Sequence, residues 1–317
     1  MSGAVTGQPR VTALGGGHGL AASLGALRRI TNRLTAIVTV ADDGGSSGRL
    51  RSEFGILPPG DLRMALAALC GDDDIERTWA QVLQSRFSGD GPLGGHAIGN
   101  LLIAGLWQQI NDPVAGLDMV AALLRVQGRV LPMSAVPLVI EADVIGADPG
   151  LPDEPVRVVG QEAVALATGV ILDVRLTPSE PPAVPEAVAA ILEADFVVLG
   201  PGSWYSSVIP HLLVPELAAA ILATPARRVL TMNLGSTTDE TDGYTASRHL
   251  EVLAEHLPTL RLDTVVVDPS FGNDPHLAAY ASSLGAEVVQ ADVRMRDGSP
   301  HHDPLKLAAV YAGIMRL

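Results

Sequence analysis

The sequence predicts an α/β fold: a Rossmann-like, doubly wound, mainly parallel sheet with a helical insert and a small strand-rich middle region. Three observations predict this class. Residues 11–30 read as a short apolar strand, a glycine-rich turn and a helix with apolar spacing near 3.6. Strand and helix patterns alternate again after residue 195, as right-handed crossovers in a parallel sheet require. Hydrophobic types make up 47% of the 317 residues and charged types 18%, which provides a sizeable core and excludes general disorder.

The first elements can be justified in order along the chain. Residues 11–14 form the first strand, and LTAIVTVA at 34–41 is β-branched without alternation, as expected of a strand buried on both faces. Four helical patterns then cover residues 62–70, 75–87, 96–110 and 114–126. Between about 129 and 182, proline-rich sequence with short valine-rich runs predicts strands and loops rather than helices.

The second half returns to alternating elements. Strands are expected at 196–202, 227–233, 264–270 and 287–293, and helices at 205–222, 246–257, 275–284 and from Asp303. Neither an internal repeat nor a clear linker is visible. We therefore expect a flexible leader at 1–10 and a single nucleotide-binding domain at 11–317, with the insert at about 61–182.

Composition narrows the function classes. Lys and Arg number 21 against 35 Asp and Glu, and the formal net charge of −14 argues against broad binding to nucleic acid or anionic lipid. The single cysteine, Cys70, excludes an internal disulfide and a cysteine-rich metal site, so a cytoplasmic location is expected. Apolar runs break before about 18 residues, so no signal peptide or membrane span is predicted. Aromatic residues are only 3%, which predicts an aliphatic core.

The glycine-rich turn is the first candidate for chemistry. Gly17, Gly19 and Ala22 fit the GxGxxG/A spacing, in which glycines let the backbone approach a phosphate at a helix N-terminus. The alternative is a turn that only lets helix and strand pack. Three consecutive glycines exceed what a tight turn needs, so we expect phosphate binding by Gly16, Gly17, His18 and Gly19.

The segment after the second strand is the next candidate. Asp42 lies near the place where a dinucleotide-binding domain carries the acidic residue for the ribose hydroxyls, which keeps an NAD site open. As a flexible polar loop, the same segment could instead hold a divalent ion and a phosphate. The simpler alternative is that its Asp and Gly residues only form a turn. It is not a Walker-type loop, because no GxxxxGK[ST] string exists. The loop residues concerned are Asp42, Asp43, Gly44, Gly45, Ser46, Ser47 and Arg49.

Two helix starts carry further polar residues. Asp61 is placed to cap a helix, and Arg63 on its first turn would face an anion held by the preceding loop. Asp43 and Asp61 are the candidate ligands for a magnesium ion. In GGHAIGNLL, His96 and Asn100 lie four residues apart on one helix face, although a lone histidine is more often structural.

Later strand ends contribute the remaining candidates. A buried strand delivers Gly200, Pro201, Gly202 and Ser203 to its carboxyl end, where open α/β sheets bind ligands. Asn233 leaves another strand end, and Thr241 and Asp242 precede a helix. Together these loops predict a single nucleotide crevice. The absence of GxSxG around Ser203 argues against hydrolase chemistry of that type.

Several of these segments together carry a family resemblance. GGGHGL, ADDGGSSGRLR with LPPGD, GHAIGNLL, GPGSWYSSVIPHLL and ETDGYTASRHL resemble the YvcK-like gluconeogenesis factors, which are related to the CofD-like 2-phospho-L-lactate transferases. The resemblance covers residue 11 to the C-terminus. It implies a bacterial, cytoplasmic Rossmann-like protein that binds nucleotide sugars such as UDP-N-acetylglucosamine and is required for cell shape and wall synthesis on gluconeogenic carbon sources. In the related transferases the crevice binds a guanine nucleotide with magnesium.

The chain departs from the family pattern at two ligand positions. His18 replaces the common Thr of GGGTG, and His301 stands where an Arg is expected, which weakens charge pairing with phosphate because histidine is largely neutral at pH 7. Tyr280 resembles the family tyrosine that packs beside the nucleotide base.

Three functions follow as alternatives. The first is a nucleotide-sugar-binding regulator that requires no cofactor, acts on a protein partner in wall-precursor synthesis and forms a homo-oligomer. The second is a magnesium-dependent phospholactyl or phosphosugar transferase. The third is an NAD-dependent oxidoreductase; NAD could also occupy the crevice as a mimic of a diphosphate ligand.

Overall fold

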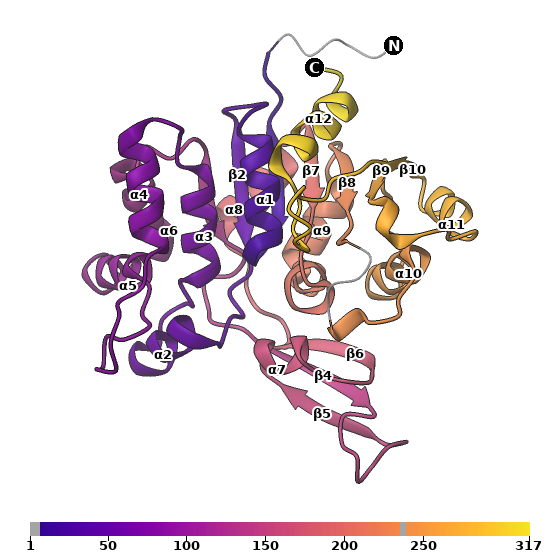
Figure 1. The fold of residues 1–317 in the computed structure, drawn as a ribbon, viewed down its shortest axis with the longest axis horizontal. Coiled ribbons are helices and arrows are strands. Elements are labelled where there is room, and N and C mark those ends of the chain that lie inside the picture. The colour runs from indigo at the N-terminus through magenta and orange to yellow at the C-terminus, as the bar shows by residue number, and fades with distance from the viewer. Residues whose placement is uncertain (1–6, 235–238) are drawn as a thin grey trace.

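The computed structural model describes residues 7–234 and 239–317, and their centre is a seven-stranded parallel sheet (Figure 1). The predicted leader at 1–10 lies mostly outside the described residues. The strand order is β10-β9-β8-β7-β1-β2-β3. The strands are β1 (Val11–Gly15), β2 (Leu34–Val38), β3 (Arg129–Pro132), β7 (Phe196–Leu199), β8 (Arg227–Thr231), β9 (Thr264–Val267) and β10 (Glu287–Gln290). The Rossmann-like, doubly wound class is confirmed.

The order of the strands reverses between β1 and β7. From β1 the chain moves outward through β2 to β3, whereas from β7 it moves the other way through β8 and β9 to β10. Right-handed crossovers in opposite directions place their helices on opposite faces of the sheet. Open α/β sheets bind ligands at such a reversal, outside the carboxyl ends of the strands. The fold therefore marks the ends of β1 and β7 as the place for a site.

Helices cover both faces of the sheet (Figure 1). Near the reversal, α1 packs between α3 and α12, while α8 packs on α9. The helices are α1 (Gly17–Leu27), α2 (Gly45–Phe54), α3 (Gly60–Leu69), α4 (Asp74–Gln84), α5 (Ile98–Ile110), α6 (Pro113–Leu123), α7 (Gln161–Ala165), α8 (Pro185–Leu192), α9 (Pro215–Ala223), α10 (Ala246–His256), α11 (Leu277–Ser283) and α12 (Pro304–Met315). A π-helical turn, η1 (Trp204–Val208), and a 3-10 turn, η2 (Ile209–Leu212), lie between β7 and α9, and η3 (Asp239–Thr241) and η4 (Pro269–Phe271) are shorter.

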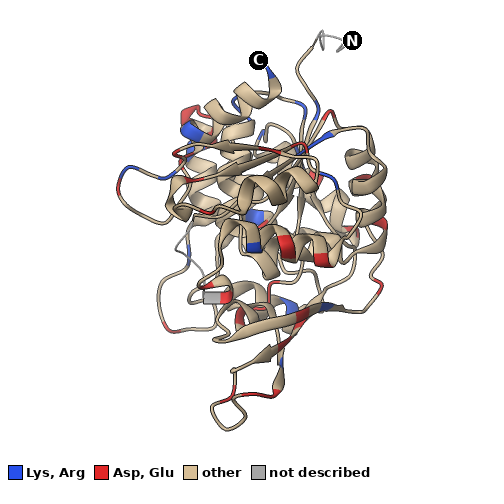
Figure 2. Ribbon diagram, turned by 90° about the vertical axis from the view of Figure 1, so that its right-hand side faces the viewer, with Lys and Arg blue, Asp and Glu red and all other residues tan. Residues whose placement is uncertain are grey.

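A small antiparallel sheet lies below the main sheet in Figure 1 and follows the order β5-β4-β6. Its strands are β4 (Val139–Ile145), β5 (Pro155–Val159) and β6 (Val170–Thr177), and α7 packs against β4 and β5. In β4 the residues alternate between buried and half-buried, so one face is covered and the other is open to solvent. Acidic and basic positions are interspersed there, as elsewhere in Figure 2, and Arg175 pairs with Asp143 at 2.7 Å.

The structure differs from several local predictions. Residues 45–54 form helix α2 rather than a flexible loop: Leu50 is buried, and Gly55 ends the helix in the left-handed region (φ 65°). A helix, α7, interrupts the region that was predicted to hold only strands and loops. β3, inside the predicted insert, is the edge of the main sheet. The aromatic residues are few, but Trp204, Tyr205 and Tyr311 are among the largest fully buried side chains, so the core is not purely aliphatic.

Within residues 7–234 and 239–317, no single helix is long and apolar enough to cross a bilayer. One bent pair, Trp204–Leu212 with Pro215–Ala223, meets the length and composition criterion only when its two parts are combined.

Candidate functional site

A cavity of about 680 Å³ opens at the reversal of the strand order. Its walls come from six places in the sequence: the turn after β1, the start of α3, the start of α7, the loop after β7, the loop after β8 and the segment before α12. Of the sequence-predicted site residues, it brings together Gly16, Gly17, His18, Gly19, Asp61, Gly202, Ser203, Asn233 and His301.

The turn after β1 and the turn after β7 touch each other. Gly17 has φ +57°, so the first residue of α1 uses a conformation that glycine adopts without strain. A Cβ on Gly19 would lie 2.7 Å from the Gly202 Cα and closer still to the Pro201 carbonyl group. Gly19 is therefore needed for the close approach of the two turns, and the α1 N-terminus with its free amides faces the cavity.

Asp61 occupies a different place from the one predicted. Pro59 is the N-cap of α3 and makes no side-chain capping bond, while Asp61 lies in the first turn of the helix. Its carboxylate lies against the α1 turn, since a Cβ on Gly16 would be 2.5 Å from Asp61 Oδ2. Burial and the neighbouring carboxylate of Asp42 raise the pKa of Asp61 to about 7, against a hydrogen bond from the Gly17 backbone and the charge of Arg63. The expected phosphate site thus contains a carboxyl group.

The opposite wall carries polar groups from two strand ends. The Gly202 N–H donates to Asn233 Oδ1 at 2.8 Å, which ties the loop after β7 to the loop after β8. Ser203 lines the cavity beside them, while Gly200 and Pro201 lie behind the wall and are not among its lining residues. The wall therefore presents one fixed amide side chain and one hydroxyl.

Two histidines meet at the mouth of the cavity. The rings of His18 and His301 lie 5.9 Å apart, edge to face. The pKa of His18 is lowered by burial, and then by the charges of His301 and Arg63. His302, the next residue, is turned inward and donates from Nε2 to the Met232 carbonyl at 3.1 Å. The segment before α12 is thus anchored by one histidine and presents the other to the cavity.

Asp43 does not meet Asp61. Its two carboxylate oxygens accept the backbone N–H groups of Gln161 and Glu162 at 3.1 and 3.0 Å, so it caps α7. Among the described residues, no group of three or more His, Cys, Asp or Glu side chains could hold a metal ion. The carboxylate coupled to Asp61 is Asp42, whose Oδ1 accepts the Gly44 N–H at 3.0 Å.

The GHAIGN motif builds a buried polar chain rather than a cavity wall. Ser46 Oγ lies 3.0 Å from His96 Nδ1 and accepts from Asn100 Nδ2 at 3.0 Å. Asn100 Oδ1 in turn accepts from Arg63 Nε at 2.9 Å. These side chains tie α2, α3 and α5 together, and Ser47 is buried nearby, against Gly60.

A second hollow, of about 610 Å³, lies over α2 and shares no lining residue with the cavity. Of the predicted site residues, it collects Asp43, Gly45, Arg49 and His96. Gly44 lines neither hollow, although it is the N-cap of α2. The sequence predicted one crevice, whereas the structure places some of the predicted residues in the cavity, some in the second hollow, and others, Asp42, Ser46, Ser47 and Asn100 among them, in neither.

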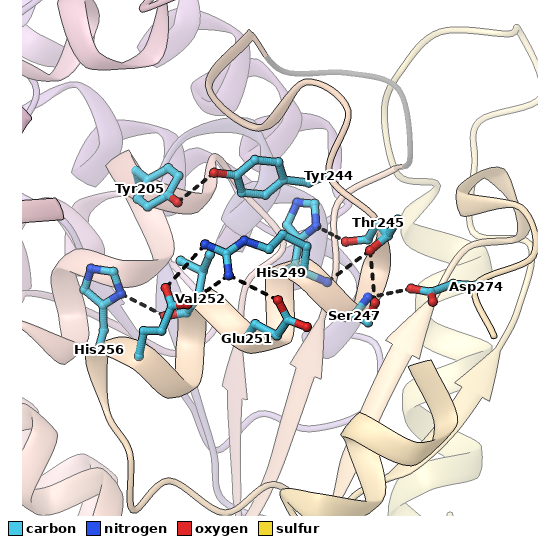
Figure 3. Close-up of polar contacts among 11 residues, drawn as sticks. Tyr205, Tyr244, Thr245, Ser247, His249, Glu251, Val252, His256 and Asp274 are labelled. Atoms are coloured by element: carbon cyan, nitrogen blue, oxygen red, sulfur yellow. Dashed lines mark hydrogen bonds and ion pairs between the residues drawn. The ribbon is translucent and has the colours of Figure 1, made fainter. Parts of the chain in front are cut away.

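The segment from Thr241 to α10 forms interior contacts (Figure 3). Tyr205 and Tyr244 join their hydroxyls at 3.1 Å, and the Thr245 hydroxyl caps α10. Thr241 is buried and Asp242 exposed, and neither lines the cavity. Tyr280 lies on α11, on the β10 side of the molecule, and does not line it either.

Comparisons with known proteins identify the family of this chain. A family model described as 2-phospho-L-lactate transferase CofD matches residues 11–302. The chain belongs to the CofD family. Its members include proteins named gluconeogenesis factor, so the resemblance read from the sequence motifs is confirmed.

Three CofD-family relatives cover nearly the whole chain. A Mycobacterium tuberculosis protein with the provisional name of gluconeogenesis factor is 55% identical, over 96% of this chain and 90% of its own. The Bacillus subtilis gluconeogenesis factor is 34% identical, over 98% of this chain and 99% of its own. The crystal structure of a UPF0052-family protein from Bacillus halodurans matches with TM-score 0.83 and 35% identity, over 95% and 98% of the two chains.

Sequence reasoning missed several residues that line the cavity of this CofD-family chain. Gln161 reaches it from α7 and Ser207 from η1, and the segment before α12 adds Met295, Asp297, Ser299, Pro300, His302 and Pro304. The DGSPHHDP string was a usable signal for that segment, although only His301 was taken from it. Gln161 carried no local signal, because α7 lies within sequence that reads as strands and loops.

Proposed function

We propose that this chain is a gluconeogenesis factor that binds a nucleotide sugar such as UDP-N-acetylglucosamine and regulates wall synthesis and cell shape through a protein partner. The observation that carries the proposal is the cavity at the strand reversal. Its volume of about 680 Å³ is in the range of small-molecule sites, and it combines a glycine-rich helix N-terminus with polar loops from two strand ends. The names of the relatives support the gluconeogenesis-factor part of the proposal only.

The geometry suggests how a nucleotide sugar would lie. The diphosphate would bind at the free amides of the α1 N-terminus, near Gly17 and His18, because a helix N-terminus attracts anions. Ser203 and Asn233 on the opposite wall offer a hydroxyl and an amide to the sugar and ribose. The His301 ring would lie at the entrance of the cavity, where the family pattern has an arginine.

Asp61 sets a condition on this binding. A diphosphate beside an ionised carboxylate is repelled, so binding favours either a proton on Asp61 or a cation between the two groups. Mg²⁺ commonly binds one or two carboxylates together with phosphate oxygens and water, and Asp42 with Asp61 fits that donor set. Asp43 does not, since both of its oxygens are engaged by α7. When bound, the ion would neutralise diphosphate charge.

Thermal stability against a ligand panel tests the proposal. A ligand that binds only the folded state raises the melting temperature, by an amount that follows its concentration relative to Kd. The panel contains UDP-N-acetylglucosamine, UDP-glucose, UDP, GDP, GTP and NAD, each with and without magnesium. The proposal expects a shift with the UDP-sugars. No shift with any uridine or guanosine diphosphate ligand would contradict it.

Two variants locate the site. His301→Ala removes an exposed group from the cavity mouth and should reduce the UDP-sugar shift, whereas His301→Arg restores a permanent cation and should increase it. His276→Ala is the control, because His276 is equally exposed but remote from the cavity lining. Equal shifts in all three variants would exclude this cavity as the binding site.

A second candidate is a magnesium-dependent phospholactyl or phosphosugar transferase. The name of the family model and the paired carboxylates of Asp42 and Asp61 beside the α1 turn favour it. A magnesium-dependent shift with guanine nucleotides, together with product formation that Asp61→Asn abolishes, would bring this candidate to the front. A shift with NAD alone would favour a dinucleotide site instead.

A further inference from the structure

Two arginines near His96 lack acidic partners: Arg49 lines the second hollow, and Arg86, which does not line it, is held at the adjoining Gly95. Arg49 donates from Nη2 to the Gly94 carbonyl at 2.9 Å, and Arg86 donates from Nη1 to the Gly95 carbonyl at 2.8 Å. Both side chains are exposed, and neither forms an ion pair with any described residue. The loop before His96 thus holds two guanidinium groups while most of their N–H donors remain available.

His96 is close enough to both arginines for their charges to act on it, and one of its ring nitrogens forms no hydrogen bond to a described residue. It is only 6% exposed, and it lines the hollow. Nδ1 is engaged by Ser46, while Nε2 makes no hydrogen bond to any described residue. Nε2 is not among the described buried polar atoms that lack a partner, so solvent reaches this nitrogen and a ligand in the hollow could do so too.

The hydrogen bonds around Ser46 decide which nitrogen carries the proton. Ser46 Oγ accepts from Asn100 Nδ2 and from the Ala97 N–H at 3.4 Å, which uses both of its lone pairs. Its single hydrogen therefore points to His96 Nδ1. Arg63 fixes the Asn100 amide in this orientation by donating to its Oδ1. Neutral His96 consequently carries its proton on Nε2, so the free nitrogen is a donor.

The positive charges around His96 also favour an anion in the hollow. The pKa of His96 is lowered by burial, then by the charge of Arg49, and also by that of Arg86, with Glu53 opposing. Arg63, 5% exposed, also feels Arg86, and its pKa falls to about 10 mainly through burial. In a chain of net charge −14, like charges are gathered here rather than separated. Such repulsion is relieved when an anion binds.

Two carboxylates line the hollow as well. Both oxygens of Asp43 accept amides of α7, so this carboxylate is turned toward α7 although it remains an anion at the hollow. Glu53 lies near the C-terminal end of α2, and no ion pair of the described residues involves it. The start of α2, by contrast, contributes the amides of its first turn at Gly45.

We propose that this hollow is an anion subsite, separate from the central cavity, that binds the phosphoryl group of a small molecule through Arg49, Arg86 and His96 Nε2–H. Guanidinium groups and imidazole N–H are the donors that phosphate oxygens accept best. The volume of about 610 Å³ admits a small metabolite around the phosphoryl group.

The test is a titration of the intact chain, labelled in its histidine rings, with inorganic phosphate at constant pH and ionic strength. NMR then follows each ring, and a His96→Gln spectrum assigns the His96 signals. We expect a saturable shift of His96, weakened about tenfold or more in Arg49→Gln and in Arg86→Gln, because a hydrogen bond to a charged group contributes about 1.5–3 kcal/mol. Arg261→Gln is the matched control: Arg261 is exposed and donates to the Ser283 carbonyl at 3.2 Å, away from the hollow.

The outcomes separate clearly. Loss of the His96 shift in both variants but not in Arg261→Gln supports the subsite, and recovery in Arg49→Lys would assign the effect to charge. The same variants should melt like the parent chain without ligand, since both arginines are exposed. Absence of a His96 shift up to about 100 mM phosphate, an unaltered shift in the two variants, or movement of His18 and His301 alone would each overturn the proposal.

Discussion

Replacing Asp61 by Asn should stabilise the folded chain at neutral and alkaline pH. Burial raises the pKa of Asp61 from 3.8 to about 7, so the folded state holds its proton more tightly than the unfolded state does. The stability that this proton provides is complete below about pH 4 and is lost progressively as the pH rises to about 7. At about 1.36 kcal/mol for each pKa unit, the loss has a ceiling of about 4 kcal/mol. Asparagine carries no charge, so the Asp61→Asn chain does not undergo this loss of stability.

The assay is chemical denaturation of both chains at several values between pH 4.5 and 8.5. The free energy of unfolding should be similar at the acidic end and should favour Asp61→Asn above pH 7. With an unfolding entropy of about 2.1 cal/mol/K per residue, the ceiling corresponds to a rise in Tm of about 6 °C. Asp61 lines the cavity and is only half-buried, so solvent screening reduces the penalty and about half of this is expected.

Asp297→Asn is the control for this prediction. Asp297 lines the same cavity, but bonds from Ser299 lower its pKa, so removal of its charge should not stabilise the chain at pH 8. Comparison within pairs is needed because Glu240, buried behind the cavity wall, also has its pKa raised to about 7 and adds its own pH dependence. If Asp61→Asn is no more stable than the parent at pH 8, ionisation of the Asp61 carboxyl group does not destabilise the folded state and the reasoning is wrong.

Three further substitutions test the packing of the site. Gly19→Ala places a methyl group against Pro201 and should cost about 1–3 kcal/mol in urea denaturation and reduce any UDP-sugar shift. Asp43→Ala removes the cap of α7 and should cost about 1 kcal/mol, with faster amide exchange at residues 161–162. Asn100→Ala leaves Arg63 without its hydrogen bond and should cost about 1–3 kcal/mol, a penalty that Arg63→Met in the same chain should reduce. Unchanged stability in any of the three would contradict the contact concerned.

The fold was largely predictable because its signals are local. Buried strands such as β2 and β9 read as continuous β-branched runs, and the helices after them show apolar spacing. The prediction was wrong for α2, whose sequence is rich in glycine and serine. Its helix depends on tertiary contacts, since Leu50 is buried and Ser46 bonds the side chains of His96, just before α5, and Asn100, within α5. Propensity alone cannot register such contacts.

The site was predictable only in part, for a topological reason. Glycine-rich turns at strand ends can be recognised in the sequence, and Gly17, Gly202 and Asn233 do line one cavity. Neither Asp42 nor Asp43 lines the cavity, and which of the two lies beside Asp61 is decided by a contact distant in sequence. Asp43 bonds α7, 118 residues further along the chain, and that leaves Asp42 as the neighbour of Asp61. No spacing within the segment distinguishes the two.

The segment that follows β2, including α2, consequently makes contacts in three different places. Asp42 acts on Asp61 in the central cavity, Asp43 holds α7, and α2 presents Arg49 to the second hollow. Because α7 also delivers Gln161 to the central cavity, a ligand there touches a helix that this segment caps. A regulator needs a physical connection between its ligand and its output, and a contiguous set of contacts is a necessary part of such coupling. The separation of the predicted crevice into two hollows is therefore compatible with regulation, because one short segment contacts both.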